Sequence, residues 1–415
     1  MPEKTRVFMV GERELNPIVS NFEVTVEKLV YGGDGLGRLN GQVVFAPFVL
    51  PGERIRAQAE REKPGLVHAR TLEVLSPAAE RVPARCPVFA RCGGCHYQHA
   101  AYEYQLGAKR AILAEELRRV GKMEPPAEIV VVAGEPWGYR NRVQLHVESG
   151  KIGYREARSH KTCGIGECPI ASPKINETIQ TLNGMLRDSR WPRMLRSLEL
   201  FTDEQQIQLN VIETDRPVAR RFFDWCGERI PGLVEGALDY AGRFRVSRKS
   251  FFQANRFLLD QLVGTAAGDI EGDTAFDLYA GVGLFAPALA RKFRQVTAVE
   301  SGPGAVRDLQ FNAERAGLAN VRAEQRTVEE FLQGVAEAPD FVLLDPPRAG
   351  LGAAVVRRLC ELRPPRVAMV ACDPATLARD LAGMAAAGYR VERMAMVDLF
   401  PQTFHLEVVA QLQAV

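Results

Sequence analysis

Alternating apolar and polar side chains mark the first part of the chain as β-structure. In FEVTVE, Phe22, Val24 and Val26 alternate with polar neighbours, which is the period of a half-buried strand. The runs GQVVFAPF, RIRAQAE and VHARTLEVL continue the pattern, and the glycine-rich stretch YGGDGLGR and a Pro-Gly pair supply turns. Residues 14–80 are therefore predicted to form a small β-barrel, either a structural module or an RNA-holding barrel of the oligonucleotide-binding (OB-like) type.

Residues 81–240 combine helical and strand periodicities. The stretch AYEYQLGAKRAILAEELRRVG has helical spacing and ends at Gly121, a residue type that commonly stops helices. RVQLHVESGKIGYRE and LELFTDEQQIQLNVIE each predict a hairpin, because two alternating runs flank a polar turn. This region is expected to be a mixed α+β central domain.

Residues 241–415 alternate short apolar runs with helical patterns. TAFDLYAG, QVTAVE, NVRAEQ, DFVLLD and RVAMVAC predict strands, and VVAQLQAV predicts another near the end. Such alternation is typical of a doubly wound parallel sheet. The chain is therefore predicted to be an α/β multidomain protein whose C-terminal domain is Rossmann-like.

A glycine turn follows the first of these strands. Gly281 and Gly283 let the backbone turn tightly and approach a ligand. The run QVTAVE then ends in Glu300, whose carboxylate can accept hydrogen bonds from both ribose hydroxyls. The turn lacks the full G-x-G-x-x-G of dinucleotide sites, so S-adenosylmethionine is the best candidate ligand. The alternative is a tight turn beside a solvated glutamate.

Three further segments end in side chains that can do chemistry. Asp345 and Cys372 close apolar strands, at the edge where doubly wound sheets bind ligands. A thiol near a helix start can have a lowered pKa and supply thiolate. DLFPQTFHLE adds Asp398, His405 and Glu407; the last two would share one face of a strand, and a carboxylate near the thiol could act as a general base.

A cysteine, a carboxylate and a methyl donor in one cleft suit methylation of a pyrimidine ring. C5 of uracil is a poor nucleophile, but addition of a thiolate to C6 creates an enolate that makes C5 nucleophilic. C5 then takes the methyl group, a base removes the C5 proton and the thiol is eliminated. The target uridine must leave its stack to reach such a cleft.

A second group of cysteines points to a metal. CPVFARCGGC places Cys86, Cys92 and Cys95 within ten residues, with two glycines that let the chain fold round an ion. The candidates for a fourth ligand are Cys163, Cys168, His96 and His99. Ligand softness alone does not separate zinc from iron–sulfur.

Composition limits the remaining possibilities. The chain has 415 residues, 46% of them apolar and 25% charged, and a net charge of +2, which exclude a disordered chain and a uniformly basic scaffold. Residues 138–161 and 241–256 are nevertheless locally basic and carry aromatic side chains, a combination that suits RNA. Because no apolar run reaches the ~20 residues of a membrane span and the charged start lacks the core of a secretory signal, a cytoplasmic location with no membrane partner is expected.

The glycine turn, DPPR, A-C-D-P and DLFPQTFHLE, in this order, resemble the RNA 5-methyluridine methyltransferase family. The resemblance covers nearly the whole chain, and its N-terminal barrel is similar to the TRAM domain, an RNA-binding module. The resemblance implies a Cys372 nucleophile and a Glu407 base. It implies cofactor contacts at Gln253, Tyr279, Glu300 and Asp345 beside the Gly281 turn, with S-adenosylmethionine as methyl donor. The chain departs from the family pattern at Ala280, Leu284 and Thr327.

The resemblance also implies a 4Fe–4S cluster held by Cys86, Cys92, Cys95 and Cys168, with Cys163 as an extra thiol. The expected activity is methylation of a uridine in structured RNA, with 23S ribosomal RNA as the expected substrate, by a monomer. Methylation of transfer RNA at a position-54-type uridine is the alternative. A third interpretation is a non-catalytic RNA-binding iron–sulfur protein that keeps the methyltransferase fold.

Overall fold

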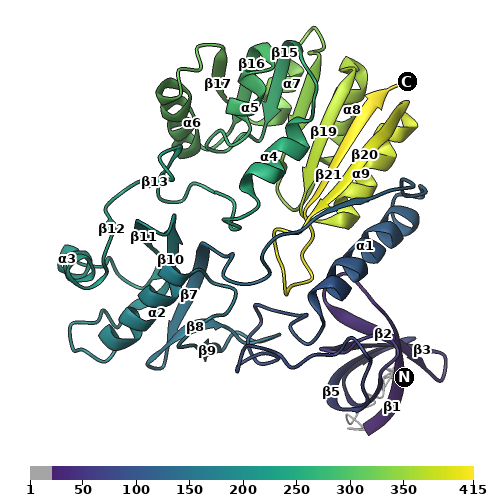
Figure 1. Cartoon of the computed structure of the whole chain (residues 1–415), viewed down its shortest axis with the longest axis vertical. Coiled ribbons are helices and arrows are strands. Elements are labelled where there is room, and N and C mark those ends of the chain that lie inside the picture. Colours follow the sequence, from purple (N-terminus) through teal and green to yellow (C-terminus); the bar gives the residue numbers. More distant parts are fainter. Residues whose placement is uncertain (1–20) are drawn as a thin grey trace, which may run out of the picture. The chain divides into compact units, whose positions relative to one another are not determined.

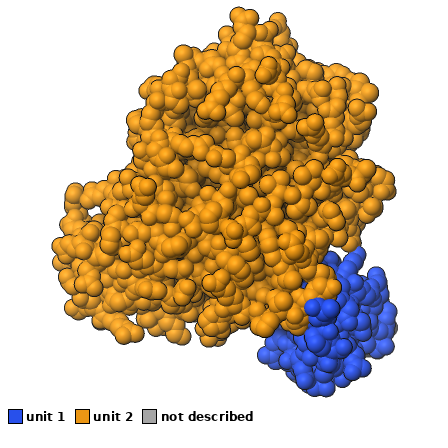
Figure 2. All heavy atoms as spheres, in the orientation of Figure 1, with its two compact units in different colours: residues 1–30, 34–79 blue, residues 31–33, 80–415 orange. Residues whose placement is uncertain are grey.

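The computed structural model describes residues 21–415; residues 14–20, which belong to the predicted barrel region, lie outside the described residues. The chain forms two compact units, coloured separately in Figure 2. Unit 1 holds the described residues up to Val30 together with Asp34–Ala79. Unit 2 holds Tyr31–Gly33 and Glu80–Val415. No helix in the described part of the chain is both long and apolar enough to cross a bilayer.

Unit 1 confirms the predicted barrel. Its five strands close in the order β1-β2-β3-β5-β4, and alternate side chains such as Val24 and Val26 are buried inside it. Gly37 is required where β2 passes β1, since a Cβ there would lie 2.5 Å from the Thr25 carbonyl oxygen. The strands are β1 (Asn21–Leu29), β2 (Asp34–Leu39), β3 (Gln42–Pro47), β4 (Arg54–Lys63) and β5 (Leu66–Ser76).

Unit 2 contains a six-stranded sheet built from the predicted central region. Both predicted hairpins are present as β7–β8 and β10–β11, and the sheet order is β12-β11-β10-β7-β8-β9. The elements are β7 (Arg142–Glu148), β8 (Lys151–Arg155), β9 (Thr162–Gly164), α2 (Pro173–Met185), β10 (Leu195–Thr202), β11 (Ile207–Thr214), α3 (Arg220–Arg229) and β12 (Leu233–Val234), followed by a small pair, β13 (Leu238–Tyr240) and β14 (Phe244–Val246).

The second sheet of unit 2 has eight strands in the order β17-β16-β15-β18-β19-β21-β20-β6 (Figure 1). The five strands predicted from apolar runs pair in parallel, and β21 runs antiparallel between β19 and β20. All four side chains of β18 are buried, as expected of a parallel strand covered on both faces. The strands are β15 (Gly272–Leu278), β16 (Phe293–Glu300), β17 (Val321–Gln325), β18 (Phe341–Leu344), β19 (Arg366–Ala371), β20 (Tyr389–Val397) and β21 (Val408–Ala414).

The eighth strand of this sheet comes from the other half of the chain. β6 (Val130–Val132) pairs in parallel with β20, and the predicted helix α1 (Tyr102–Arg119) packs beside α9. The expected boundary at residues 240–241 therefore lies inside one compact unit. The remaining helices are α4 (Leu259–Ala267), α5 (Ala286–Ala290), α6 (Pro303–Arg315), α7 (Val328–Gln333), α8 (Gly352–Leu362) and α9 (Pro374–Ala386).

Candidate active site

A cavity of about 920 Å³ opens in unit 2 at the carboxyl ends of the parallel strands. Side chains from the loops after β15, β16, β18 and β19 line it, together with the segment before β21 and residues near β7. The seven residues singled out for catalysis and cofactor binding all line this one cavity: Cys372, Glu407, Gln253, Tyr279, Gly281, Glu300 and Asp345. Their individual roles stay predictions.

The glycine turn forms an open cradle in the cavity wall. Tyr279 and Gly281 have φ of 63° and 56°, so the backbone doubles back after β15. No heavy atom lies within 4 Å of a Cβ built on Gly281, which leaves room for a ligand against the main chain. The Glu300 carboxylate is fixed here, because it accepts hydrogen bonds from the Gly281 amide at 3.0 Å and the Gly302 amide at 2.6 Å.

Asp277 is a buried acid beside this cradle that the sequence reasoning missed. Its side chain is fully buried, and neither carboxyl oxygen has a hydrogen-bond partner among the described residues. Burial, followed by the charges of Asp345 and Glu300, raises the pKa of Asp277 to about 8. The only signal in the sequence is an acid inside the apolar run AFDL. Asp277 does not itself line the cavity, but a positively charged ligand in the cradle, such as S-adenosylmethionine, would favour its ionised form.

The thiol of Cys372 lies where β19 ends, but the expected low pKa is wrong. Burial, and next the charge of Glu407, raise the pKa of Cys372 to about 11, while Arg348 opposes the rise. The following helix does not offer its first amides to the thiol. They donate instead to Oδ1 of Asp373, from Ala375 at 3.0 Å and from Thr376 at 2.9 Å.

Two carboxyl groups face the thiol. Burial and the nearby Asp345 raise the pKa of Glu407 well above the ordinary value, and Arg348 again opposes the rise. Burial raises the pKa of Asp345 to about 7. An ionised Glu407 is therefore a stronger base than an exposed carboxylate, because its charged form gains little from solvent.

His405 and Glu407 both line the cavity, but they do not share one face of a strand as expected. β21 begins at Val408, so both residues lie in the preceding loop and not in a strand. Both nevertheless line the cavity. Burial, assisted by Arg348, lowers the pKa of His405 to about 3, so its imidazole is neutral near pH 7.

The basic segments present fewer unpaired cations than their composition suggests. Phe244 and Phe252 are each 2% exposed and belong to the core, whereas Phe251 is 66% exposed at the cavity. Lys249 also lines the cavity. Three arginines of residues 241–256 pair with acids: Arg243 with Asp260 at 2.8 Å, Arg245 with Asp308 at 3.4 Å and Arg256 with Glu204 at 3.7 Å.

Arg142 is a further cavity residue that sequence reasoning did not single out, although it lies in a segment recognised as basic. Its guanidinium donates twice to Glu199, at 2.9 Å each, and to the Ser250 carbonyl oxygen at 2.8 Å. This fork ties β7 and β10 to the segment that carries Gln253 and Phe251.

The cysteine cluster surrounds a separate cavity of about 240 Å³ in unit 2. Cys86, Cys92, Cys95 and Cys168 line it, while Cys163 does not and instead accepts a hydrogen bond from Arg91 Nε at 3.3 Å. Among residues 21–415, no group of three or more His, Cys, Asp and Glu side chains is arranged to hold a single metal ion. Arg140, Gln144 and His405 line both cavities, so the two are neighbours.

Comparison with known proteins agrees with this geometry. The family model described as tRNA (Uracil-5-)-methyltransferase matches residues 188–415, and the TRAM domain model matches residues 18–72. An uncharacterised RNA methyltransferase of Streptomyces coelicolor is 36% identical, over 99% of this chain and 95% of its own length. The 23S rRNA (uracil(1939)-C(5))-methyltransferase RlmD of Aeromonas hydrophila is 32% identical, over 94% and 95%.

A solved structure is similar over most of the chain as well. It is the tRNA (uracil-54, C5)-methyltransferase of Pyrococcus abyssi in complex with S-adenosyl-L-homocysteine. The two share 25% sequence identity and superpose with a TM-score of 0.71, which covers 94% of this chain and 100% of the other.

Proposed function

Because this chain belongs to the tRNA (uracil-5-)-methyltransferase family, we propose that it methylates C5 of a specific uridine in structured RNA through a covalent adduct with Cys372. The observation that carries the proposal is that one cavity is lined both by the Gly281–Glu300 cradle and by Cys372 and Glu407. A methyl donor and a pyrimidine ring could therefore occupy the same cavity.

The first step belongs to Cys372. The thiol first gives its proton to solvent. Its sulfur then forms a bond to C6 of the uracil, and the electrons of the C5–C6 double bond move toward O4, which makes C5 nucleophilic. Burial and the charge of Glu407 raise the pKa of the thiol, so the thiolate must form before the attack on C6. Arg348 assists, because its cation lowers the pKa of Cys372.

The last step belongs to Glu407. Its carboxylate removes the C5 proton, the electrons of that C–H bond reform the C5–C6 double bond, and the C6–S bond breaks to release the thiolate. Burial beside Asp345 raises the pKa of Glu407, which strengthens it as a base for this step.

S-adenosylmethionine, when bound, supplies the methyl group. Glu300 would hold the ribose, since backbone amides already aim its carboxylate. Gln253, Tyr279, Gly281 and Asp345 would hold the rest of the cofactor from the cavity wall. The open backbone at Gly281 fits this group. The S-adenosyl-L-homocysteine complex of the Pyrococcus relative supports the same donor.

We infer that the substrate is 23S ribosomal RNA. Support comes from the Aeromonas relative, whose own length is covered to 95%. Transfer RNA is the second candidate, favoured by the Pyrococcus enzyme that this chain resembles over 94% of its length. The barrel would add an RNA-binding surface, in line with its match to the TRAM domain.

We also infer a 4Fe–4S cluster at Cys86, Cys92, Cys95 and Cys168. Four thiols around one cavity are the donor set of such a cluster. These four thiols would hold the cluster and supply its protein ligands. The cluster would hold the central segments together and shape the RNA surface.

Covalent trapping tests the proposed function. Transcripts of 23S rRNA and of tRNA that carry 5-fluorouridine are incubated with the enzyme and S-adenosylmethionine, and denaturing gels detect the protein–RNA adduct. Fluorine cannot leave C5 as a proton, so the adduct should persist with the cognate transcript. Cys372→Ala should abolish it, and Cys360→Ala, a half-buried thiol on α8, should not. Equal trapping by Cys372→Ala would show that another residue is the nucleophile.

A further inference from the structure

The segment that carries Glu407 is held from outside its own sheet. We call residues 398–407, between β20 and β21, the strap. The strap has no strand or helix of its own, and Gln402 has a φ of 68°. Its position must therefore be set by contacts with neighbouring segments.

The strap backbone is fixed by side chains and amides from much earlier in the chain. Each carbonyl from Leu399 to Gln402 accepts a hydrogen bond from a residue numbered below 260. The donors are Asn255 Nδ2 to Leu399 at 3.0 Å, Lys109 Nζ to Phe400 at 2.9 Å, Tyr139 OH to Pro401 at 3.0 Å, and the His96 and Tyr97 amides to Gln402 at 2.8 and 3.0 Å.

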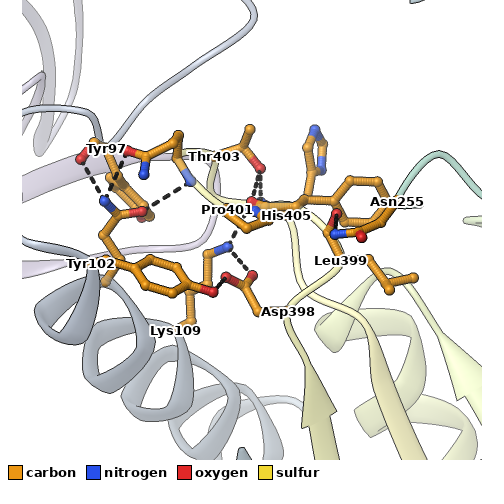
Figure 3. A network of polar contacts seen from close by, with 12 residues as sticks. Tyr97, Tyr102, Lys109, Asn255, Asp398, Leu399, Pro401, Thr403 and His405 are labelled. Carbon is orange, nitrogen blue, oxygen red and sulfur yellow. Dashed lines mark hydrogen bonds and ion pairs between the residues drawn. The ribbon is translucent and has the colours of Figure 1, made fainter. Parts of the chain in front are cut away.

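The strongest of these anchors is a buried ion pair on the inner face of α1. Lys109 Nζ lies 2.6 Å from Asp398 Oδ1, and the two side chains are 0% and 1% exposed. Tyr102 donates to the other oxygen of Asp398 at 2.9 Å. Figure 3 shows these groups converging where the strap leaves β20. The same ammonium bridges Asp398 and the Phe400 carbonyl, so it fixes the first turn of the strap.

Stability alone does not account for an ion pair at this place. Apolar side chains of similar volume often stabilise a core as well as a buried ion pair does, whereas the pair imposes one geometry. The two ends of the strap are also joined, because the Val397 amide donates to the Glu407 carbonyl oxygen at 2.8 Å. The Asp398 amide also donates to the Val132 carbonyl oxygen of β6 at 2.8 Å, so the ion pair adds a side-chain restraint next to the point where Val397 binds Glu407.

We propose that Lys109, acting through Asp398, is a positioning residue for Glu407, an inference that rests on the proposed function. Lys109 does not line the cavity, so it touches neither substrate nor cofactor. Its effect is to hold the strap so that the Glu407 carboxyl group faces the adduct formed at Cys372. Loss of the Lys109–Asp398 ion pair should impair removal of the C5 proton more than the steps before it.

The test compares two RNAs with the full-length enzyme. Lys109→Met keeps the length and the apolar stem of the side chain but removes its donors. Tyr102→Phe removes one bond to Asp398 and is the milder variant if Lys109→Met folds poorly. Arg110→Met, an exposed neighbour on the same helix, is the matched control. Each variant is assayed for turnover on uridine RNA and for trapping on 5-fluorouridine RNA, which needs no base.

Lys109→Met should lower kcat by about 10- to 100-fold, with the KM for RNA within twofold of the wild-type value. It should also accumulate a methylated, denaturation-resistant adduct on ordinary uridine RNA, because the adduct forms but is not resolved. Trapping on 5-fluorouridine RNA should stay near the wild-type rate. Tyr102→Phe should show the same pattern more weakly, and Arg110→Met should match the wild type.

Two results would overturn the proposal. One is turnover by Lys109→Met within twofold of the wild type. The other is an equal loss of turnover and of trapping without an accumulated adduct, which is what general loosening of the fold would produce. If the wild-type enzyme neither methylates nor traps RNA, the proposed function itself fails, and the positioning role falls with it.

Discussion

Cys372, the proposed nucleophile, lies in surroundings that favour its protonated form. Burial and Glu407 raise its pKa to about 11, and only Arg348 among its named neighbours lowers it. A thiol with this pKa is almost entirely protonated near physiological pH, since each pH unit below the pKa reduces the thiolate about tenfold.

Alkylation of Cys372 should reveal this protonation directly. In the absence of RNA, the rate of iodoacetamide labelling should rise about tenfold per unit between pH 7 and 9, because only the thiolate reacts. Arg348→Gln should slow labelling, since removing the cation raises the pKa further. Peptide mass spectrometry at residue 372 separates this thiol from the other seven cysteines. A rate that does not change with pH would contradict the raised pKa.

At the scale of elements, short helices and loops position the cysteine cluster more than strands do. Cys168 lies between β9 and α2, and Asn176 of α2 holds it by two bonds. Its side-chain oxygen accepts from the Cys168 amide at 2.8 Å, and its amide donates to the Cys168 carbonyl at 3.0 Å. Cys163, only five residues earlier, lies within β9 and outside the cysteine cavity.

Metal analysis of two serine variants should separate these thiols. Cys168→Ser is expected to lose most of its iron when purified anaerobically, since a ligand at the cavity is missing. Cys163→Ser is the control and should keep the iron content and the visible absorption of the wild type. One equivalent of zinc and no iron in the wild-type protein would refute the iron–sulfur assignment.

At the scale of the whole molecule, charge is nearly balanced, with 53 cations against 51 anions. Much of the local positive charge is already paired within unit 2, as at Arg243 and Asp260. Lys249, which lines the cavity, is a cation of this segment that would be placed to attract RNA there. Paired arginines contribute less, because a phosphate would have to displace their acid.

The salt dependence of RNA binding checks this distribution. Affinity should fall as salt rises, and Lys249→Ala should weaken binding and reduce the slope of log K against log salt by about 1. Arg294→Ala is the control: this arginine is exposed, pairs with Asp273 and lies near the start of β16, away from the cavity. Equal effects of the two substitutions would show that RNA binding depends on the total charge of the protein and not on the cation at the cavity.

The sequence predicted the helices and strands that have a clear local pattern of apolar and polar residues. Apolar runs located six strands of the second sheet, and helical spacing located α1 to within two residues of its end. The prediction missed β20 (Tyr389–Val397), and it missed β6, which has three residues and is recognisable only through its pairing with β20. It also missed Lys109 and Asp277, because burial of a charged side chain depends on partners that local periodicity does not reveal. Lys109 and Asp398 are 289 positions apart.

That separation has a consequence while the protein is being made. At about 5–20 residues per second, a ribosome needs roughly 15–60 s to synthesise the residues between Lys109 and Asp398. During this time Lys109 cannot form its ion pair, because Asp398 has not yet been made. Gly281 and Glu300 are synthesised before the strap, residues 398–407. A chain that stops before residue 407 lacks the carboxylate proposed as the base, so it is not expected to complete the proposed reaction.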